Sequence, residues 1–271
     1  MTFNVLCSFC NDEYDPWEER LGYFADIFER HDPDLIGLQE MTWPEEVDQF
    51  LTLREGFEAV YFVGESEGPF GFKDYPDATI LYRSGRFTLQ DKGFFWLSTE
   101  PEEPWSTGWA EGLQFSRIVA WAIFEDAQSE NMVFVVNTHF DNNTPNQEHS
   151  APLLLERVAP HAGSMPVIVT GDFNSQPDDE AYEILTEGVD GAGFKLTNSF
   201  DLAADWSAIT NQDPEPGYDF AECIDHIFVA GENTAWECSQ WTVDQYVYGQ
   251  EDEYPSDHRA ISAVLEYALN Q

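Results

Sequence analysis

The sequence of 271 residues predicts an α/β fold in which two packed β-sheets are flanked by helices. Strand-like runs outnumber helical runs, and the two do not alternate in the strict order typical of a repeated strand–helix–strand unit. The composition is 42% hydrophobic and 15% aromatic, which is enough apolar material to fill such an interior. No linker, composition break or repeat divides the chain, so residues 1–271 are interpreted as a single domain.

The first unit is expected to run strand, helix, strand. Thr2–Cys7 alternates between apolar and polar residues, as a half-buried strand does. Asp15, followed by Pro16 and with a Glu in the first turn, is typical of a helix cap. The helix is expected to end at Asp32-Pro33, and Leu35–Leu38 to form a buried strand that leads to Gln39 and Glu40.

The rest of the chain contains eight further strand-like runs and two clear helices. Strands are expected at Ala78–Tyr82, Arg86–Leu97, Arg117–Phe124, Met132–Thr138, Pro166–Thr170, Ile224–Val229, Trp236–Val247 and Ala260–Tyr267. Helices are expected at Gln147–Val158 and Asp178–Leu185. Residues 98–116 are rich in Glu, Pro, Gly and Trp, and are interpreted as a long loop that lines a cleft.

The charge is strongly unbalanced, with 52 acidic against 11 basic residues and a formal net charge of -41. Such a surface repels itself at low salt, whereas in molar salt the Debye length falls to about 3 Å and the repulsion is screened. The hydrophobic content excludes the composition of a disordered acidic chain. We interpret the chain as a halophilic protein adapted to molar salt; an ordinary acidic mesophilic protein is the alternative.

The same charge restricts the partners. Nucleic-acid-binding proteins normally carry a basic stripe that neutralises phosphates, and none is visible here. The substrate is therefore either small, or a polyanion held through metal ions and aromatic contacts in high salt. No run is long enough to span a membrane, and no obligate protein partner is evident. We expect a location in a high-salt cytoplasm, with a secreted form still open.

The four cysteines are Cys7, Cys10, Cys223 and Cys238. Cys7 and Cys10 have the C-x-x-C spacing, but they end an expected core strand rather than open a helix. No second pair of ligands at zinc-finger spacing follows them. We therefore expect buried free thiols rather than a disulfide or a metal site.

Polar residues recur at the ends of apolar runs, where a sheet sandwich can project side chains into a shared cleft. They are Glu40 after LIGLQ, His139 and Asp141 after VFVVNT, Asp172 and Asn174 after PVIVTG, and Asp257 and His258 just before the last strand. Asp225, followed by His226, differs because it lies inside the apolar run CIDHIFVA.

Each of these residues has a simpler interpretation when it is taken alone. Glu40 fits the cap of a following helix, His139 a core histidine, and Asp172 and Asp257 fit polar turns. Asp225 is harder to explain in this way, because an unpaired buried carboxylate is costly. It is the joint occurrence of these residues, in this order, that predicts a catalytic cleft.

The blocks resemble a known family. FNV (Asn4), LQE (Glu40), NTHFD (His139), GDFNSQP (Asp172), IDHIFV (Asp225) and SDHRAI (Asp257 and His258) occur in the order of the endonuclease/exonuclease/phosphatase superfamily. The resemblance covers the whole chain, and GDFN with a terminal SDH is its most specific part. It implies a four-layer α/β/β/α sandwich with two packed mixed sheets. It also implies a phosphoester hydrolase that depends on Mg²⁺ or Mn²⁺.

The resemblance implies three metal ligands. Glu40 is expected to be the principal ligand, with Asn4 beside it and Asp257 at the same or a second metal position. These are oxygen ligands, which suit octahedral Mg²⁺ or Mn²⁺.

The resemblance also implies the catalytic residues. Asp172 is expected to orient or deprotonate the attacking water, Asn174 to donate to a phosphoryl oxygen, and His139 to contact a non-bridging oxygen. His258, paired with Asp225, is expected to transfer a proton or to bind the phosphate. Whether Asp172 or His258 is the general base stays open at this point.

Further residues are candidates for the substrate. Arg117 is expected to bind phosphate, with a surface salt bridge as the alternative. Trp96, Trp105 and Trp109 are candidates to stack on a base or sugar, although ordinary packing is the preferred interpretation in an aromatic-rich chain, and Trp96 is kept as the substrate-binding candidate.

Three other polar residues are secondary. Asp77 fits the additional acid of some relatives poorly, since YPDATILY does not match their usual pattern. Asp141 is expected either to support His139 through a hydrogen bond or to act directly. His226 is expected to be structural.

The leading hypothesis is a divalent-metal-dependent phosphodiester hydrolase, a nuclease that cleaves DNA or RNA by in-line attack of water in molar salt. The alternative is a phosphomonoesterase or small-molecule phosphodiesterase that acts on a nucleotide, sugar phosphate or lipid headgroup. The basic loops of inositol phosphatases and the Lys- and Arg-rich helices of DNA-gripping relatives are missing. A catalytically silent binding module on the same fold is a further class.

Overall fold

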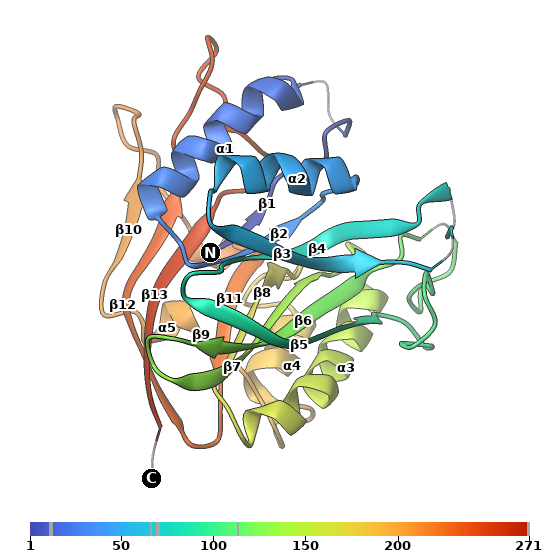
Figure 1. Cartoon of the computed structure of the whole chain (residues 1–271). Coiled ribbons are helices and arrows are strands. Elements are labelled where there is room, and N and C mark those ends of the chain that lie inside the picture. The colour runs from blue at the N-terminus through green and yellow to red at the C-terminus, as the bar shows by residue number, and fades with distance from the viewer. Residues whose placement is uncertain (11–12, 66, 69–70, 113, 270–271) are drawn as a thin grey trace.

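In the computed structural model, which describes residues 1–10, 13–65, 67–68, 71–112 and 114–269, two mixed β-sheets pack face to face (Figure 1). The seven-stranded sheet has the order β10 (Trp206–Ile209), β12 (Thr234–Asp244), β13 (Ile261–Leu269), β1 (Thr2–Asn4), β2 (Leu35–Gln39), β4 (Asp74–Arg83) and β3 (Phe57–Val63). The six-stranded sheet has the order β5 (Phe87–Trp96), β6 (Ile118–Asp126), β7 (Asn131–His139), β8 (Val167–Asp172), β11 (Asp225–Ala230) and β9 (Thr197–Asn198).

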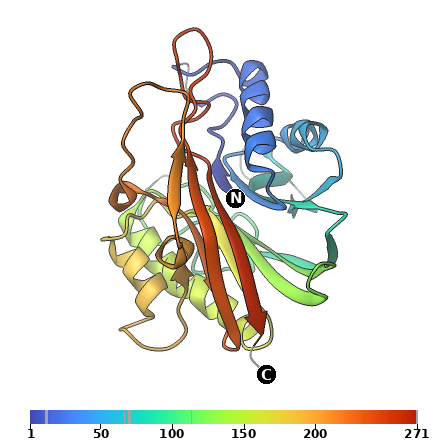
Figure 2. The same cartoon turned by 90° about the vertical axis from the view of Figure 1, so that its left-hand side faces the viewer.

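Helices cover the outer face of each sheet. Figures 1 and 2 show α1 (Trp17–His31) and α2 (Pro44–Leu53) together on one side, and α3 (Thr144–Ala162) and α4 (Glu180–Glu187) on the other. The short α5 (Ser199–Leu202) and a 3-10 turn at Phe220–Glu222 lie in connections. The expected α/β fold of two packed mixed sheets flanked by helices is confirmed. Among the described residues, no helix is both long and apolar enough to cross a membrane.

Three apolar layers hold these elements together. Between α1 and its sheet, Phe24 and Phe28 pack with Phe3 and Ile36, because residues three and four apart in α1 share one face. Between the two sheets, the interior includes Ile80, Phe124 and Val135. Under α3 and α4 it includes Phe134, Leu154, Val169, Leu185 and Phe228. The strands between the layers are buried on both faces, which explains their continuous apolar runs.

Some boundaries differ from those expected. The first strand ends at Asn4 rather than at Cys7, because Leu6 has a positive φ of 52°, which a strand does not accommodate. Pro16 occupies the cap position of α1, and Asp15 instead accepts a hydrogen bond from the hydroxyl of Tyr23. The third helix is longer than expected at both ends. The edge strands β3, β9 and β10 were not expected, and β9 and β10 have only two and four residues.

The prediction for Cys7 and Cys10 was wrong, since the two form a disulfide with a Cα–Cα distance of 5.2 Å. The reason is the early end of β1, which leaves both cysteines on a turn in which Cys10 N donates to Cys7 O at 3.3 Å. Cys223 and Cys238 are free and buried, as expected.

Candidate active site

Three neighbouring strands of the six-stranded sheet bring three predicted residues into line. In the parallel pair β7 and β8, His139 is opposite Asp172, and each ends its strand. The next strand, β11, runs antiparallel to β8, and its first residue, Asp225, is opposite Asp172. Asp225 therefore starts its strand at the edge where the other two strands end. The apolar run around it in the sequence hides this position.

The other sheet contributes Asn4 and Glu40 at the facing edge. Asn4 ends β1 and is fully buried, and its Nδ2 donates to Asp172 Oδ2 at 2.9 Å and to Glu40 Oε1 at 3.0 Å. Its Oδ1 accepts from Leu6 N at 3.0 Å. The predicted metal ligand Asn4 thus presents its amino group to two carboxylates and joins the two sheets at the site.

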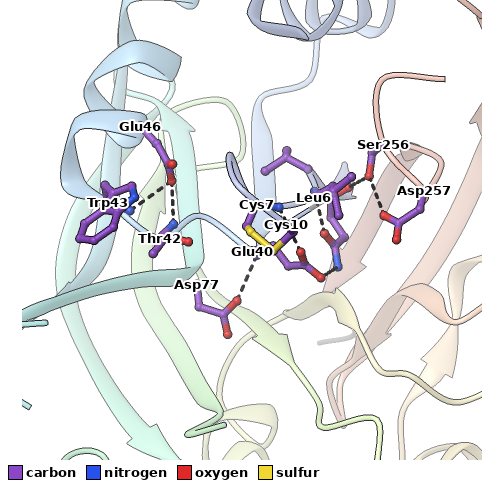
Figure 3. Close-up of a disulfide and its surroundings, with 12 residues drawn as sticks. Leu6, Cys7, Cys10, Glu40, Thr42, Trp43, Glu46, Asp77, Ser256 and Asp257 are labelled. Carbon is purple, nitrogen blue, oxygen red and sulfur yellow. Dashed lines mark hydrogen bonds between the residues drawn. A yellow bond between two sulfur atoms is a disulfide. The ribbon is translucent and has the colours of Figure 1, made fainter. Parts of the chain in front are cut away.

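Hydrogen bonds fix both the backbone and the side chain of Glu40. It has a positive φ of 69°, which is uncommon for a residue with a side chain, and its backbone N donates to Asp77 Oδ1 at 3.0 Å. Glu40 Oε2 accepts from Cys7 N at 3.1 Å, as Figure 3 shows. It does not cap α2, because Glu46 does so by accepting from Trp43 N at 3.1 Å. Glu40 is half-buried, and its side chain is not used to cap a helix.

Asp172 lies between two histidines, each of which is held by a second carboxylate. On one side, His258 Nε2 is 3.6 Å from Asp172 Oδ2, and His258 Nδ1 is 2.7 Å from Asp225 Oδ2. On the other side, His139 Nε2 is 3.5 Å from Asp172 Oδ2, and His139 Nδ1 is 2.9 Å from Asp77 Oδ1. The order Asp225–His258–Asp172–His139–Asp77 is the centre of the site. Asp77, which matched the family pattern poorly, belongs to it.

The charges within this row follow from the neighbours. Burial alone would raise the pKa of Asp172, but His258 and His139, with hydrogen bonds from Asn4 and Asn174 N, lower that pKa below its usual value. Burial alone would lower the pKa of His258, but the carboxylates of Asp225 and Asp172 raise it to about 10. At neutral pH, Asp172 is therefore ionised and His258 carries a proton.

Arg117 adds a positive charge on the His139 side. It precedes β6, and its Nη1 is 2.7 Å from Nδ1 and 3.1 Å from Nε2 of His139. The same atom is 3.7 Å from Asp77 Oδ2, and only 12% of the Arg117 side chain is exposed. The surface salt bridge considered for Arg117 is therefore not what the structure contains.

Asp257 and His258 lie on the loop before β13, which is tied to the end of β1. Ser256 Oγ donates to Asn4 O at 2.8 Å and accepts from His258 N at 3.1 Å. Asp257 is exposed, and Figure 3 shows it in the same region as Glu40. The loop hydrogen bonds thus place both predicted carboxylate ligands around the end of one strand.

Buried Arg20 was missed in the sequence, although it positions this loop. From α1, its Nη1 donates to Val5 O at 2.6 Å and to Pro255 O at 3.1 Å, and its Nη2 donates to Cys7 O at 3.1 Å. Arg20 is the one charged member of the buried face of α1. A charged residue on an otherwise apolar helical face is the pattern that would have revealed it, because a buried cation requires partners.

The oxygen-bearing side chains fit a hard divalent cation. Each carboxylate oxygen of Glu40 accepts one hydrogen bond, from Asn4 Nδ2 or from Cys7 N, which leaves lone pairs for an ion, and Asp257 is open to solvent. Asp172, Asp225 and His258 also have ligand atoms within 4.8 Å of one another. The raised pKa of His258 places a proton on its imidazole in the metal-free protein, so a cation bound by this second set would have to displace that proton.

Asn174 lies in the turn directly after β8. Its positive φ of 47° is a conformation that Asn tolerates better than most residues, and its backbone N donates to Asp172 Oδ1 at 2.8 Å. Its Nδ2 donates to Phe140 O at 2.9 Å. The side chain is therefore fixed beside Asp172 by the turn that GDFN encodes.

The predicted substrate-stacking residue Trp96 does not join this group. It is 2% exposed, and its ring stacks on Tyr75 at 5.8 Å and contacts Trp105 at 5.2 Å, so the packing alternative describes it. Trp109 contacts the ring of His149 at 5.1 Å. Trp96 and Trp105 thus pack with each other beside the long loop, whereas Phe115, near the end of that loop, is 64% exposed.

Asp141 holds neighbouring backbone and side chains in place through hydrogen bonds. Its Oδ1 accepts from Asn143 N at 3.0 Å, and its Oδ2 accepts from Asn146 Nδ2 at 3.0 Å. Asn146 Oδ1 in turn accepts from Ala110 N at 2.8 Å. Asp141 thus fixes the start of α3 and, through Asn146, the loop that crosses it.

Residues 1–258 match the model of the Endonuclease/Exonuclease/phosphatase family. The chain belongs to this family. As a member of the endonuclease/exonuclease/phosphatase family, it is a phosphoesterase, and the resemblance found in the sequence is confirmed.

Solved structures of the family share the whole fold. The mannosyl-6-phosphatase of Bacteroides thetaiotaomicron is 26% identical with a TM-score of 0.79, and the match covers 98% of each chain. An endonuclease/exonuclease/phosphatase from Bacteroides vulgatus is 25% identical with a TM-score of 0.79, covering 98% of this chain and 97% of the other. The catalytic domain of human nocturnin, at 19% identity and a TM-score of 0.69 over 98% and 93% of the two chains, is similar in fold.

A curated relative is known from a virus. An uncharacterized protein of Acanthamoeba polyphaga mimivirus is 26% identical over 161 residues, which are 59% of each protein. The chain thus spans about three fifths of the length of this relative. The match adds a distant family member without adding an activity.

Proposed function

We propose that the protein is a Mg²⁺- or Mn²⁺-dependent hydrolase of small phosphomonoesters, with sugar phosphates as the substrate class. The row centred on Asp172 is the observation that carries the proposal. It combines an ionised carboxylate with two histidines, one of them protonated, at the edge where both sheets supply oxygen ligands. Phosphoester hydrolysis needs these groups: one to orient water, cations to offset the phosphate charge, and a proton for the leaving oxygen.

Each residue has a task in this proposal. Glu40 and Asp257 would hold the metal ion, which offsets phosphate charge and polarises a phosphoryl oxygen when it is bound. The predicted ligand Asn4, whose Nδ2 faces two carboxylates, would orient Glu40 instead of binding the ion. For the reaction itself, Asp172 orients a water molecule and accepts its proton as the water oxygen attacks phosphorus. His258 donates its proton to the departing ester oxygen as the P–O bond breaks, and Asp225 keeps the imidazole in place.

The phosphate itself would be bound by three side chains on the other side of Asp172. Arg117 and His139 face the site together, and Asn174 is fixed beside it. These side chains offer donors to the non-bridging oxygens, where negative charge builds in the transition state. The raised pKa of His258 assigns it to proton donation, so Asp172 is the better candidate for the base.

The cations of the chain favour a small substrate over nucleic acid. Five arginines outside the site already form ion pairs with protein carboxylates: Arg30, Arg54, Arg83, Arg86 and Arg157. Arg20 and Arg259 donate to backbone carbonyls. The three lysines lie on separate segments, at Lys73, Lys92 and Lys195. Nothing in this set forms the basic stripe that tracks a nucleic-acid backbone. The similarity to a mannosyl-6-phosphatase points the same way.

A nuclease that acts on DNA or RNA is the second candidate. Two exposed aromatic residues near Glu40 favour it, because bases stack on such rings. Phe9 is 65% exposed and Trp43 is 43% exposed, with their ring centroids 6.5 Å apart. In molar salt, moreover, basic residues gain little from phosphate contacts, so a nuclease there needs fewer of them.

The net charge of -41 supports a working environment of molar salt, and we include a high-salt cytoplasm in the proposal. An activity assay should therefore be made in molar KCl. At low salt, unfolding would also lower the measured activity, so a loss of folding would not be distinguished from a loss of catalysis.

The test compares substrates in the same buffer. Mannose 6-phosphate, glucose 6-phosphate, mono- and bis-nitrophenyl phosphate, linear DNA and RNA are each incubated with Mg²⁺ or Mn²⁺ and with a chelator. We expect phosphate release from the monoesters, its loss with the chelator and its return with added metal. Cleavage of nucleic acid alone would replace the proposal with the second candidate. Hydrolysis that persists after complete metal removal would contradict the metal dependence.

A further inference from the structure

The Cys7–Cys10 disulfide lies directly against Glu40. Cys7 N donates to Glu40 Oε2 at 3.1 Å, and Figure 3 shows the sulfur–sulfur bond beside the Glu40 side chain. Cys7 is buried, whereas Cys10 is exposed, so the bond can be reached from solvent through Cys10. A reducible bond and a carboxylate thus share one small region of the surface.

The possible ligand atoms of Cys7, Cys10 and Glu40 all lie within 4.8 Å of one another. Two thiolates bound to one tetrahedral zinc ion at about 2.3 Å are roughly 3.8 Å apart, and a carboxylate oxygen lies at a similar distance from each. The three side chains therefore need only small movements to surround one ion once the sulfur–sulfur bond is broken.

We propose that reduction of the Cys7–Cys10 disulfide opens a second metal site, in which two thiolates and the Glu40 carboxylate bind a soft divalent cation of the zinc class. A dithiol reductant supplies two electrons and two protons, so that the disulfide becomes two thiols and the reductant becomes a disulfide. Binding of the cation then releases the two thiol protons. Exposed Cys10 leaves a fourth position of the ion open to water.

The backbone around the site is already fixed without the disulfide. Arg20 donates to Leu6 O at 3.0 Å and to Cys7 O at 3.1 Å, and the turn bond from Cys10 N to Cys7 O closes the loop. Both cysteines should stay near Glu40 after reduction, because these bonds do not involve sulfur. Thiolates prefer zinc, cobalt and cadmium over magnesium, so the reduced site selects a different cation from the all-oxygen site.

A consequence for catalysis rests on the function proposed above. If Glu40 holds the catalytic Mg²⁺ or Mn²⁺, a soft cation that takes the Glu40 carboxylate removes a ligand from the working ion. The oxidised disulfide keeps Glu40 for the hard cation, and reduction in the presence of zinc stops hydrolysis. The disulfide would thus decide which class of cation the same carboxylate serves.

Cobalt binding to the full chain tests the site without any measurement of activity. The oxidised and the reduced protein are titrated with Co²⁺ after the reductant has been removed under argon, and the thiolate-to-cobalt charge-transfer absorption is followed. We expect one Co²⁺ per reduced chain, displaced by Zn²⁺, and no such band from the oxidised chain. A reduced chain without the band would overturn the proposal.

Three variants locate the site. Cys10→Ser and Glu40→Gln should weaken cobalt binding by more than the roughly 10- to 100-fold that loss of an outer-shell partner costs. Cys238→Ser is the matched control, because Cys238 is a free buried thiol on β12, and it should leave the band unchanged. A band that is lost in Cys238→Ser, or kept in Cys10→Ser, would also overturn the site.

Hydrolysis of a phosphomonoester by the reduced chain, with and without Zn²⁺, then separates the two proposals. Cobalt binding together with zinc inhibition supports both. Cobalt binding without zinc inhibition supports the thiolate site and counts against Glu40 as a ligand of the catalytic ion. Activity with no cobalt band supports the function and overturns the second site.

Discussion

His258 and His226 are two histidines beside Asp225, and their surroundings make the first positively charged and the second neutral. Burial alone would lower the pKa of His258, but Asp225, whose Oδ2 is 2.7 Å from its Nδ1, and Asp172 raise that pKa to about 10. Burial lowers the pKa of His226 to about 4, and among the described residues its ring nitrogens lie 2.9 Å from Ser175 O and 3.2 Å from Asn198 Nδ2. The hydrogen-bonded carboxylate of Asp225 thus distinguishes the surroundings of His258 from those of His226.

Strand geometry explains how one short stretch produces both environments. Asp225 and His226 are successive residues of β11, so their side chains point to opposite faces of the sheet. Asp225 faces the cleft and His258. His226 faces the interior, where the rings of Tyr182 and Phe228 lie 4.9 Å and 5.4 Å away. His258 therefore lies with Asp225 among the candidate catalytic residues on one face of β11, whereas His226 packs in the interior on the other face.

The largest expected effect comes from replacing a charged residue of the site. His258→Asn or Asp172→Asn should reduce kcat/KM for the phosphomonoester by at least about a hundredfold, because each removes a group that moves a proton. Steady-state rates in molar KCl with Mg²⁺ measure the loss, and circular dichroism checks the fold. Activity close to that of the native chain in both variants would show that the row around Asp172 is not the catalytic centre.

His226→Gln is the matched control on the neutral side. Gln can still donate to Ser175 O, and the side chain points away from the cleft, so kcat/KM should stay near the native value. The free energy of unfolding should fall, since Gln does not fill the aromatic surroundings of the imidazole. A hundredfold loss of activity in this variant would mean that the two faces of β11 are not independent.

The next effect is a dependence of stability on pH. Unfolded His226 binds a proton below its ordinary pKa of 6.5, whereas folded His226 stays neutral down to about 4. The unfolded state therefore binds more protons between these values, and the free energy of unfolding falls as the pH drops through this window. The loss should reach on the order of 2 kcal/mol near pH 4.5.

Denaturant unfolding at a series of pH values, for the native chain and for His226→Gln, measures this loss as the difference between the two curves. Taking the difference cancels the contribution of the many surface carboxylates, because they titrate in both proteins. Parallel curves from pH 7 to pH 4.5 would contradict the neutral state of folded His226.

The comparison also explains how much the sequence could predict. Polar residues at strand ends located Glu40, His139 and Asp172, because strand ends are visible in the alternation and length of apolar runs. Asp225 was noted inside its apolar run because a buried carboxylate needs a partner, and the family blocks paired it with His258. The part played by Asn4 could not be predicted, since its bond to Asp172, 168 residues away in the chain, depends on how the two sheets meet.

Other features escaped because they depend on where the backbone turns. Arg20 appeared as one more charge on a helix until its carbonyl partners were known. The disulfide depends on the end of β1 at Asn4, which a positive φ at Leu6 causes and no local composition announces. Trp96 was a candidate for stacking on the substrate, but its ring is buried among other aromatic residues, as the packing interpretation had it.

The smallest expected effect concerns salt. It is the effect of KCl on the difference between the native chain and His226→Gln in how the free energy of unfolding depends on pH. Raising KCl from about 0.1 M to about 1 M shortens the Debye length from about 10 Å to about 3 Å, so the unfolding temperature of both proteins should rise as the surface repulsion is screened. The difference between their pH curves should not change, because burial sets the pKa of His226 and salt does not reach it. A difference that grows in molar KCl would mean that the acidic surface raises the pKa of His226 at low salt, because negative charges favour the protonated imidazole.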